Sequence, residues 1–283
     1  MKLALGTVQF GLDYGITNST GLVSREEVKS ILSLAGAQKI HTLDTAAGYG
    51  RSETVLGALA NKSFNIISKI PSLSNLQGTI NESLSTTLHR LNRETLYGMM
   101  LHDERDISKK SQYNELISLK KEGLITKIGC SFYSLEALEF ALNENIELDI
   151  IQIPGSCLDQ RFEKSGLLNR AKENEIEIHC RSVFLQGLLL TPVVLTPVLK
   201  EFEAEINAFY KFAESYYIKP IDLALSYIYQ SKHIDYGVVG CQSKSQLEQI
   251  ISSYKDIENK KLNIPLAKLA STSEVLLNPS LWS

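Results

Sequence analysis

Short apolar runs of strand length alternate with longer amphipathic stretches along the whole 283-residue chain. An apolar run of about four to eight residues is typical of a buried strand, whereas apolar positions at helical spacing are typical of one helix face. Strands are predicted to begin near eight positions: Lys2, His41, Asn65, Leu96, Lys127, Asp149, Glu177 and Ile234.

The stretch 24–37 shows the helical pattern most clearly. Its apolar residues between Val28 and Ala35 fall on one face, and Ser24 followed by Glu27 has the spacing of a capping box. Further helices are predicted over 76–91, 113–122, 135–145, 166–174, 206–230 with a break at Pro220, 245–252 and 266–277.

Eight strand-then-helix units in this length predict a parallel (β/α)8 barrel, the TIM-barrel class, because an open doubly wound sheet more often has fewer strands. No Gly/Ser/Pro-rich linker divides the chain, so we expect a single domain over residues 1–283. The irregular connection 184–198 follows the seventh strand, and in a barrel it would lie over the rim that carries binding and catalysis.

Composition narrows the possible partners. The net charge is −3, and no Lys/Arg cluster marks a surface for nucleic acid or for an anionic membrane. No apolar run approaches membrane-spanning length and the start does not resemble a signal peptide, so we expect a cytoplasmic protein with a small-molecule partner. The four cysteines lack metal-ligand spacing and are predicted to be reduced, buried thiols; the sequence does not determine the oligomeric state.

Four polar residues lie where predicted strands end: Asp44, Lys69 and His102 close three strands, and Tyr49 follows Asp44 in a Gly-flanked turn. Each alone has a simpler explanation as a surface, cap or loop residue, but the ends of parallel barrel strands meet at one rim. A tyrosine can donate a proton near neutral pH only with help from a neighbouring charge. Lys69 could supply that charge, Asp44 could keep Lys69 protonated, and His102 could orient the reacting oxygen.

The segment from Asp44 to Glu53, DTAAGYGRSE, followed by Leu56-Gly57, resembles the aldo/keto reductase signature D-T-A-x-x-Y-G-x-S-E-x-x-L-G. The resemblance continues in order to the region 239–248. It implies hydride transfer from a nicotinamide cofactor to an aldehyde or ketone, with Tyr49 as general acid, Lys69 and Asp44 tuning it, and His102 aligning the carbonyl. A Rossmann site is unsupported, because Gly6 and Gly11 do not have the G-x-G-x-x-G spacing.

The same resemblance implies how a cofactor would lie along the rim. Ser131 and Gln152 would hold the nicotinamide carboxamide, the loop 182–187 would follow the pyrophosphate, and the region 240–246 would meet the adenosine-phosphate end at a helix N-terminus. The complete set of expected cofactor contacts is Thr7, Asp44, Ser131, Gln152, Arg181, Ser182, Phe184, Gln186, Gly187, Gly240, Gln242, Lys244 and Gln246. No metal ligand is expected.

The chain departs from the family pattern around the cofactor. Phe132 stands where Asn is common, and Arg181 stands where an aromatic ring often stacks on the nicotinamide. At the expected 2′-phosphate position a usual Arg is Gln242, and Lys244 is the one local cation. We therefore expect NADPH to be preferred with weakened affinity, so that NADH use is possible.

The segments 13–18 and 181–190 resemble a branch associated with bacterial surface-polysaccharide and sugar modification, which implies a sugar-derived or nucleotide-linked carbonyl. Candidate substrate contacts at the rim are Tyr14, His102, Asp103, Arg105, Arg161 and Arg181. Two alternatives stay open. One is a regulatory barrel that binds the cofactor with little turnover, and the other is a lyase that forms a Schiff base on Lys69.

Overall fold

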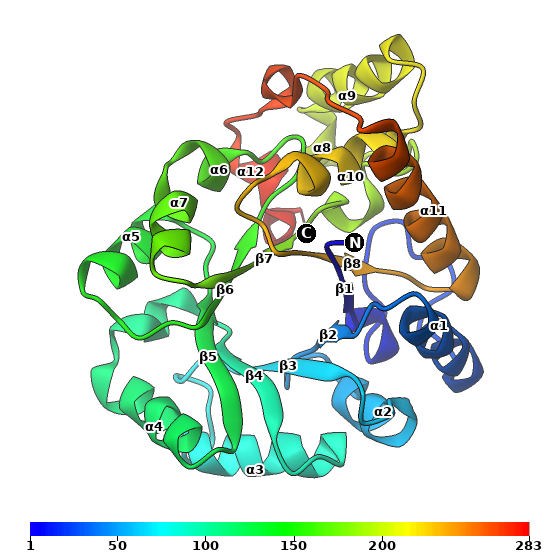
Figure 1. Cartoon of the computed structure of the whole chain (residues 1–283). Coiled ribbons are helices and arrows are strands. Elements are labelled where there is room, and N and C mark those ends of the chain that lie inside the picture. Colours follow the sequence, from blue (N-terminus) through cyan, green and yellow to red (C-terminus); the bar gives the residue numbers. More distant parts are fainter. Residues whose placement is uncertain (283) are drawn as a thin grey trace.

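The strands close into a barrel, as a computed structural model of residues 1–282 shows (Figure 1). Each strand pairs in parallel with the next one in the chain, and the last pairs with the first, which confirms the predicted (β/α)8 barrel. The strands are β1 (Leu3–Gly6), β2 (Thr42–Asp44), β3 (Asn65–Ile70), β4 (Leu96–Leu101), β5 (Ile125–Ser131), β6 (Ile150–Pro154), β7 (Glu177–Arg181) and β8 (Tyr236–Gly240). Only Ser283 of the expected domain lies outside the described residues.

Helices surround the barrel (Figure 1). They are α1 (Arg25–Ala37), α2 (Ser52–Leu59), α3 (Ile80–Leu91), α4 (Lys110–Lys121), α5 (Leu135–Asn143), α6 (Arg161–Lys164), α7 (Leu167–Glu173), α8 (Pro197–Lys200), α9 (Glu203–Ser215), α10 (Pro220–Gln230), α11 (Lys244–Lys260) and α12 (Glu274–Leu277). The predicted break at Pro220 is confirmed, because this residue is the first of α10 and its fixed φ suits that position.

Three of the observed helices differ from the sequence prediction. The predicted helix 266–277 is instead a short 3₁₀ helix, Leu266–Leu269, followed by α12. The helix predicted over 245–252 continues to Lys260, and α2 was not predicted, since its eight residues carry too short an apolar stripe. These differences arise because packing against the barrel, rather than local pattern, decides where short helices form.

The capping box expected at α1 is only half formed. Ser24 accepts a hydrogen bond from the Glu27 amide, but the Glu27 carboxylate accepts one from the Lys244 amide of α11. A complete capping box starts α3, where Thr79 and Glu82 cap each other's backbone amides. The side chain of Glu27 therefore connects two helices that are far apart in the sequence.

The apolar core has two parts. A large cluster of buried side chains fills the space between the strands and the surrounding helices. A small separate cluster contains Ile67, Met100 and Ile150. Side chains two positions apart on a strand point to the same face, so Ile67 and Ile150 lie on the same face as Lys69 and Gln152 and fill the barrel interior below them.

Two further properties concern binding. All four cysteines are free and buried, as predicted. Within residues 1–282, no helix is both long and apolar enough to cross a membrane, and no group of three or more His, Cys, Asp and Glu side chains could hold a metal ion.

Candidate active site

Asp44, Lys69 and Gln152 meet inside the carboxyl-terminal mouth of the barrel. Lys69 Nζ donates to the two carboxylate oxygens of Asp44 at 2.7 and 2.6 Å and to the carbonyl oxygen of Thr45 at 3.0 Å. Gln152 Nε2 donates to Asp44 Oδ2 at 2.8 Å. Strands β2 and β6 are not neighbours, so this contact crosses the barrel interior. The ammonium group of Lys69, which is fully buried, thus has a partner for each of its three protons.

Tyr49 and His102 complete the cluster. Lys69 Nζ lies 5.3 Å from the centroid of the Tyr49 ring, and the rings of Tyr49 and His102 lie 5.9 Å apart at an interplanar angle of 80°. The His102 amide donates to the carbonyl of Ile70 at 3.1 Å, which holds the residue beside the end of β3. The structure therefore brings together all four residues that the sequence analysis proposed for proton transfer.

Burial sets the protonation states in this cluster. It raises the pKa of Tyr49, and the Asp44 carboxylate raises this pKa further. Burial, together with the charge of Lys69, lowers the pKa of His102 to about 4. Burial also lowers the pKa of Lys69, but the paired Asp44 opposes this shift. At neutral pH the site thus holds a protonated phenol, a neutral imidazole and an ion pair.

Two glycines allow the loop that carries Tyr49 to lie against the loop after β1. A Cβ atom on Gly11 would be 1.8 Å from the carbonyl oxygen of Tyr49, and one on Gly50 would be 2.4 Å from the Gly11 oxygen. Gly50 also has φ of +56°, a conformation that side chains disfavour. Sequence reasoning used Gly11 only to reject a dinucleotide motif, and nothing in the local pattern showed that it contacts a loop near residue 50.

Thr7, expected as a cofactor contact, is fully buried. Its hydroxyl donates to the Asp44 carbonyl oxygen at 2.9 Å, and Ser52 Oγ lies 2.9 Å from Thr7 Oγ1. In this arrangement Thr7 supports the backbone of Asp44, and its contact with a cofactor stays a prediction.

The expected nicotinamide and pyrophosphate contacts lie at the same mouth. Ser131, the last residue of β5, pairs in register with Gln152, the third residue of β6. In the loop after β7, Ser182, Leu185 and Gln186 have φ of 64°, 44° and 54°. Left-handed conformations are unusual for residues other than glycine and concentrate at functional loops.

The other expected cofactor contacts of this loop differ in burial and in their hydrogen bonds. Phe184 is buried, whereas Gln186 Nε2 donates to the hydroxyl of Tyr14 at 3.3 Å. Gly187 has φ of +95° and lies against Thr17.

Gly240, at the end of β8, lies against the side chain of Gln9. A Cβ atom on Gly240 would be 2.7 Å from the amide oxygen of Gln9. This oxygen is buried and has no hydrogen-bond partner among the described residues. This unpartnered oxygen beside a glycine fits the approach of a ligand to the end of β8.

The start of α11, the expected 2′-phosphate position, fits a phosphate poorly. The carboxylate of Glu27 accepts from the Lys244 amide, and Lys244 Nζ lies 3.5 Å from Glu248. Gln246 Oε1 accepts from the Gln242 amide at 2.7 Å. A phosphate would therefore meet a carboxylate and amides that already have acceptors.

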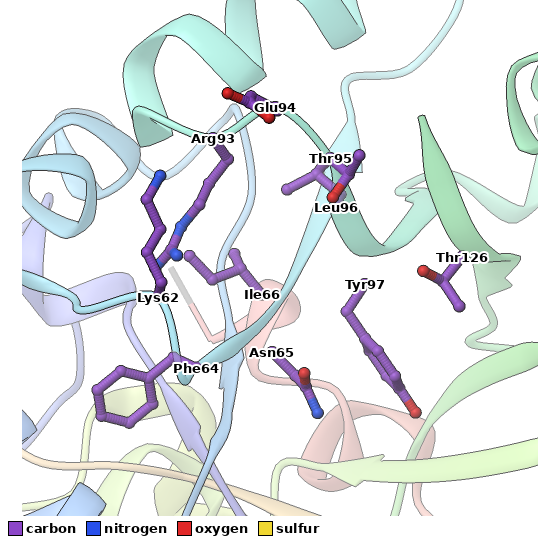
Figure 2. Close-up of a pocket in the computed structure, with 10 residues that line it drawn as sticks. All are labelled: Lys62, Phe64, Asn65, Ile66, Arg93, Glu94, Thr95, Leu96, Tyr97 and Thr126. Carbon is purple, nitrogen blue, oxygen red and sulfur yellow. The ribbon is translucent and has the colours of Figure 1, made fainter. Parts of the chain in front are cut away.

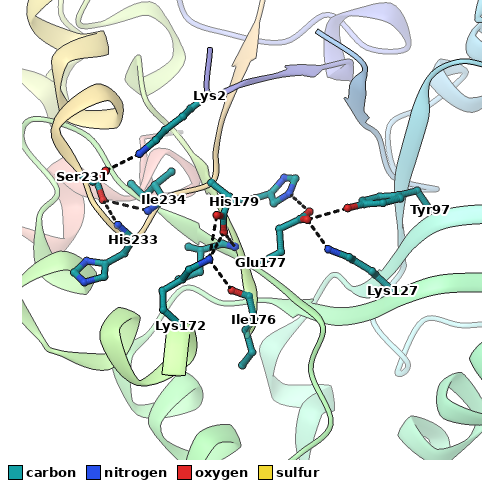
Figure 3. Close-up of polar contacts among 12 residues, drawn as sticks. Lys2, Tyr97, Lys127, Lys172, Ile176, Glu177, His179, Ser231, His233 and Ile234 are labelled. Atoms are coloured by element: carbon teal, nitrogen blue, oxygen red, sulfur yellow. Dashed lines mark hydrogen bonds and ion pairs between the residues drawn. The ribbon is translucent and has the colours of Figure 1, made fainter. Parts of the chain in front are cut away.

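The opposite mouth of the barrel contains a pocket and a cluster of polar residues around Glu177. A pocket of about 380 Å³ is lined there by residues such as Asn65 and Leu96, the first residues of β3 and β4. Figure 2 shows the residues that line it. Figure 3 shows Glu177, at the start of β7, within hydrogen-bond distance of Tyr97, Lys127 and His179. Since Lys69 lies near the other end of β3 and His102 directly follows β4, these features are distinct from the Tyr49 cluster.

A sequence model of the aldo/keto reductase family matches residues 2–263. The chain belongs to the aldo/keto reductase family. Family membership supports oxidoreductase activity on carbonyl compounds, and the family generally uses nicotinamide cofactors. No curated protein sequence matches this aldo/keto reductase significantly.

Solved structures of aldo/keto reductases share its fold. A protein from Bacillus halodurans, an aldo-keto reductase in its holo form, superimposes with a TM-score of 0.75 at 18% identity, covering 96% of this chain and 93% of that chain. A Pseudomonas aeruginosa protein assigned as an aldo-keto reductase has a TM-score of 0.68 at 20% identity, with 90% of each chain covered. At these identities the likeness concerns the fold.

Proposed function

We propose that this protein reduces an aldehyde or ketone to an alcohol with NAD(P)H, and that Tyr49 is the general acid. The observation that carries the proposal is the cluster of Tyr49, Lys69, Asp44 and His102 at the carboxyl-terminal mouth of the barrel. This is the face where barrel enzymes place their chemistry. The nicotinamide cofactor would supply the hydride.

Each residue of the cluster has a defined role in this proposal. Tyr49 stays protonated until the carbonyl oxygen gains negative charge, and then donates its phenolic proton to that oxygen. The nearby ammonium of Lys69 stabilises the phenolate that forms, and Asp44 keeps Lys69 protonated. His102 is neutral at pH 7, so one ring N–H can donate a hydrogen bond that orients the carbonyl.

Replacement of Tyr49 by Phe tests the proposal. We expect kcat for carbonyl reduction to fall by about 100- to 10,000-fold, the usual contribution of a positioned acid. The measurement is NADPH oxidation against aldehydes, ketoses and nucleotide-linked ketosugars, with circular dichroism to confirm the fold. Undiminished reduction by Tyr49→Phe would refute the proton-donor role.

The cofactor identity is a finer proposal. The sequence favours NADPH with NADH possible, and the environment of Glu27 adds a reason for weak selection of the 2′-phosphate. We propose that both cofactors bind at the rim, with the phosphate-selective contact reduced. Gln152, Ser131 and the loop 182–187 would hold the remainder of the cofactor.

The alternatives receive less support. A Schiff-base lyase needs a neutral lysine, but the three hydrogen bonds of Lys69, two of them to a carboxylate, favour the ammonium form. Borohydride trapping of a substrate adduct on Lys69 would restore that alternative. No described contact specifically favours a regulatory barrel, and a slow single turnover without sustained reduction would be its signature.

A further inference from the structure

Arg181, the last residue of β7, is a rim cation at the same mouth as Tyr49. Its Nη2 atom donates to the carbonyl oxygen of Phe132 at 3.3 Å, and Phe132 follows β5. The side chain thus reaches across the end of β6, the strand that carries Gln152. Its Cζ atom lies 3.6 Å from the centroid of the Tyr133 ring, which holds the guanidinium in a defined plane.

Arg181 differs from the two other arginines proposed for the rim. Arg105 forms an ion pair with Asp103, and Arg161 forms one with Asp159. Within residues 1–282, no carboxylate lies at salt-bridge distance from Arg181, and its Nε atom is buried without a hydrogen-bond partner. A half-buried guanidinium with a free donor is costly unless a ligand supplies an acceptor.

The charged residues of the Tyr49 cluster pair with each other and not with Arg181. Asp44 and Lys69 neutralise each other, and His102 is uncharged at pH 7. Burial has the largest effect on the pKa values of Tyr49 and His102, and the charge of Arg181 lowers both. A carbonyl compound bound beside Tyr49 would therefore lie close to the guanidinium of Arg181.

We propose that Arg181 binds an oxyanion group of the substrate, so that the preferred substrate is a carbonyl compound carrying a carboxylate or a phosphate. The inference rests on the proposed reductase function and adds the class of its substrate. A planar guanidinium suits both groups, because two parallel N–H donors match two oxygens. Tyr133 provides the orientation, and Nη1 and Nη2, which donate to Ser182 and Phe132, each keep a second N–H for the oxyanion.

Matched substrates test the preference in the wild-type protein. The ratio of kcat/KM for 2-, 3- and 4-carboxybenzaldehyde to that for benzaldehyde varies the distance between carbonyl and carboxylate. We expect at least one isomer to be favoured about 10- to 100-fold, the effect of a charge-assisted hydrogen bond. Glyceraldehyde 3-phosphate against glyceraldehyde separates a phosphate preference from a carboxylate preference. A wild-type protein that favours no anionic member would overturn the inference.

Variants assign the preference to Arg181. Arg181→Met removes the charge and keeps an apolar stem on Tyr133, so the ratio should fall to about that of the neutral compounds, whereas Arg181→Lys should retain part of it. Arg170→Met is the matched control, since it removes an arginine of α7 that is outside the proposed site and already donates to Asn143; its ratio should stay within about twofold of the wild type. An equal fall for charged and neutral substrates, with weaker binding of NADPH and NADH by fluorescence titration, would place Arg181 on the cofactor and overturn the inference.

A binding measurement separates this inference from the reductase function. Calorimetric titration with benzoate and benzamide, with NADPH present, requires no turnover. Benzoate should bind about tenfold or more tightly than benzamide to the wild type, and this difference should disappear in Arg181→Met. If no carbonyl is reduced but the benzoate difference is present, the reductase proposal fails while the anion contact stands. If carbonyls are reduced without that difference, the anion contact fails.

Discussion

Lys69 and His102 illustrate how single residues acquire their proposed chemistry. Both are strand-end residues of ordinary type, yet burial and the neighbouring charges decide which protons they hold. Lys69 gives all three of its donors to Asp44 and Thr45, so it can act on Tyr49 only through its charge at 5.3 Å from the ring centroid. His102 is left as a neutral donor. These roles depend on protonation, and pH therefore tests them.

We expect carbonyl reduction to show no inflection from His102 near its ordinary pKa of about 6.5. Burial and then Lys69 lower the pKa of His102 to about 4, so the neutral imidazole persists through the mildly acidic range. The measurement is kcat/KM from pH 8 to 5 for the wild type and His102→Gln. An inflection near 6.5 that occurs only in the wild type would contradict a neutral His102.

The same shift has a consequence for stability. Between pH 6.5 and about 4 the unfolded chain binds the His102 proton and the folded chain does not. The contribution of His102 to folding is therefore retained above pH 6.5 and lost as the pH falls toward 4. Urea unfolding of His102→Gln should show a smaller loss over that interval than the wild type does.

At the scale of elements, loops and helix ends place the site residues. The loop after β1 contacts the loop that carries Tyr49 through Gly11, and α1 contacts the start of α11 through Glu27. Neither contact follows from the pattern of one segment. Both connect parts of the chain that lie far apart in sequence, and each can be changed by one substitution.

Gly11→Ala should displace the Tyr49 loop. The new methyl group would overlap the Tyr49 carbonyl, which is backbone and can move only with the loop. We expect kcat to fall about 100-fold, since a misplacement of about 1 Å can cost that much. Gly48→Ala is the control in the same loop, because a Cβ atom there meets nothing within 4 Å. Equal activity of the two variants would show that the contact does not position Tyr49.

Glu27→Gln should improve binding of NADPH. The amide oxygen can still accept from the Lys244 amide, but the negative charge that would repel a 2′-phosphate is gone. We expect the NADPH dissociation constant to fall about three- to tenfold and that of NADH to change less than about twofold, by fluorescence titration. Glu26→Gln, on the exposed side of α1, is the control. Equal changes in the dissociation constants of NADPH and NADH would show that Glu27 does not act on the 2′-phosphate.

At the scale of the whole molecule, the proposed active site and the Glu177 cluster lie at opposite mouths of the barrel. Glu177 joins β7 to β4 and β5 through Tyr97 and Lys127, and it also contacts His179 (Figure 3). Burial alone would raise the pKa of Glu177, but hydrogen bonds from His179 and Lys127 outweigh burial and lower it to about 2. The cluster thus holds strands together across the barrel, far from Tyr49.

Glu177→Gln should therefore lower stability without a matching loss of kcat. Loss of the charge leaves buried donors poorly satisfied, at a cost of about 1–3 kcal/mol, which corresponds to a fall in Tm of several degrees. The contribution of Glu177 is present above its unfolded pKa of 4.5 and lost as the pH falls toward 2, so the Tm difference should shrink in acid. A Tm difference as large at pH 2.5 as at pH 7 would contradict this account.

The sequence by itself determined the repeating architecture. Alternating apolar patterns located all eight strands, and strand-end placement located Asp44, Tyr49, Lys69 and His102, because in a parallel barrel such positions must converge. Caps of the type at Ser24 also followed from local chemistry. Short helices such as α2 and α12 did not, since too few residues carry their pattern.

Only the tertiary structure decided which polar side chains already have hydrogen-bond or ion-pair partners. Several features all depend on residues distant in sequence: the three hydrogen bonds of Lys69, the contact of Glu27 with α11, the overlap that makes Gly11 necessary and the contacts of Arg181 with Phe132 and Tyr133. Periodicity reports which face of an element is apolar. It does not report which polar partner lies across the barrel, and that partner sets both the charge and the free donors of the site.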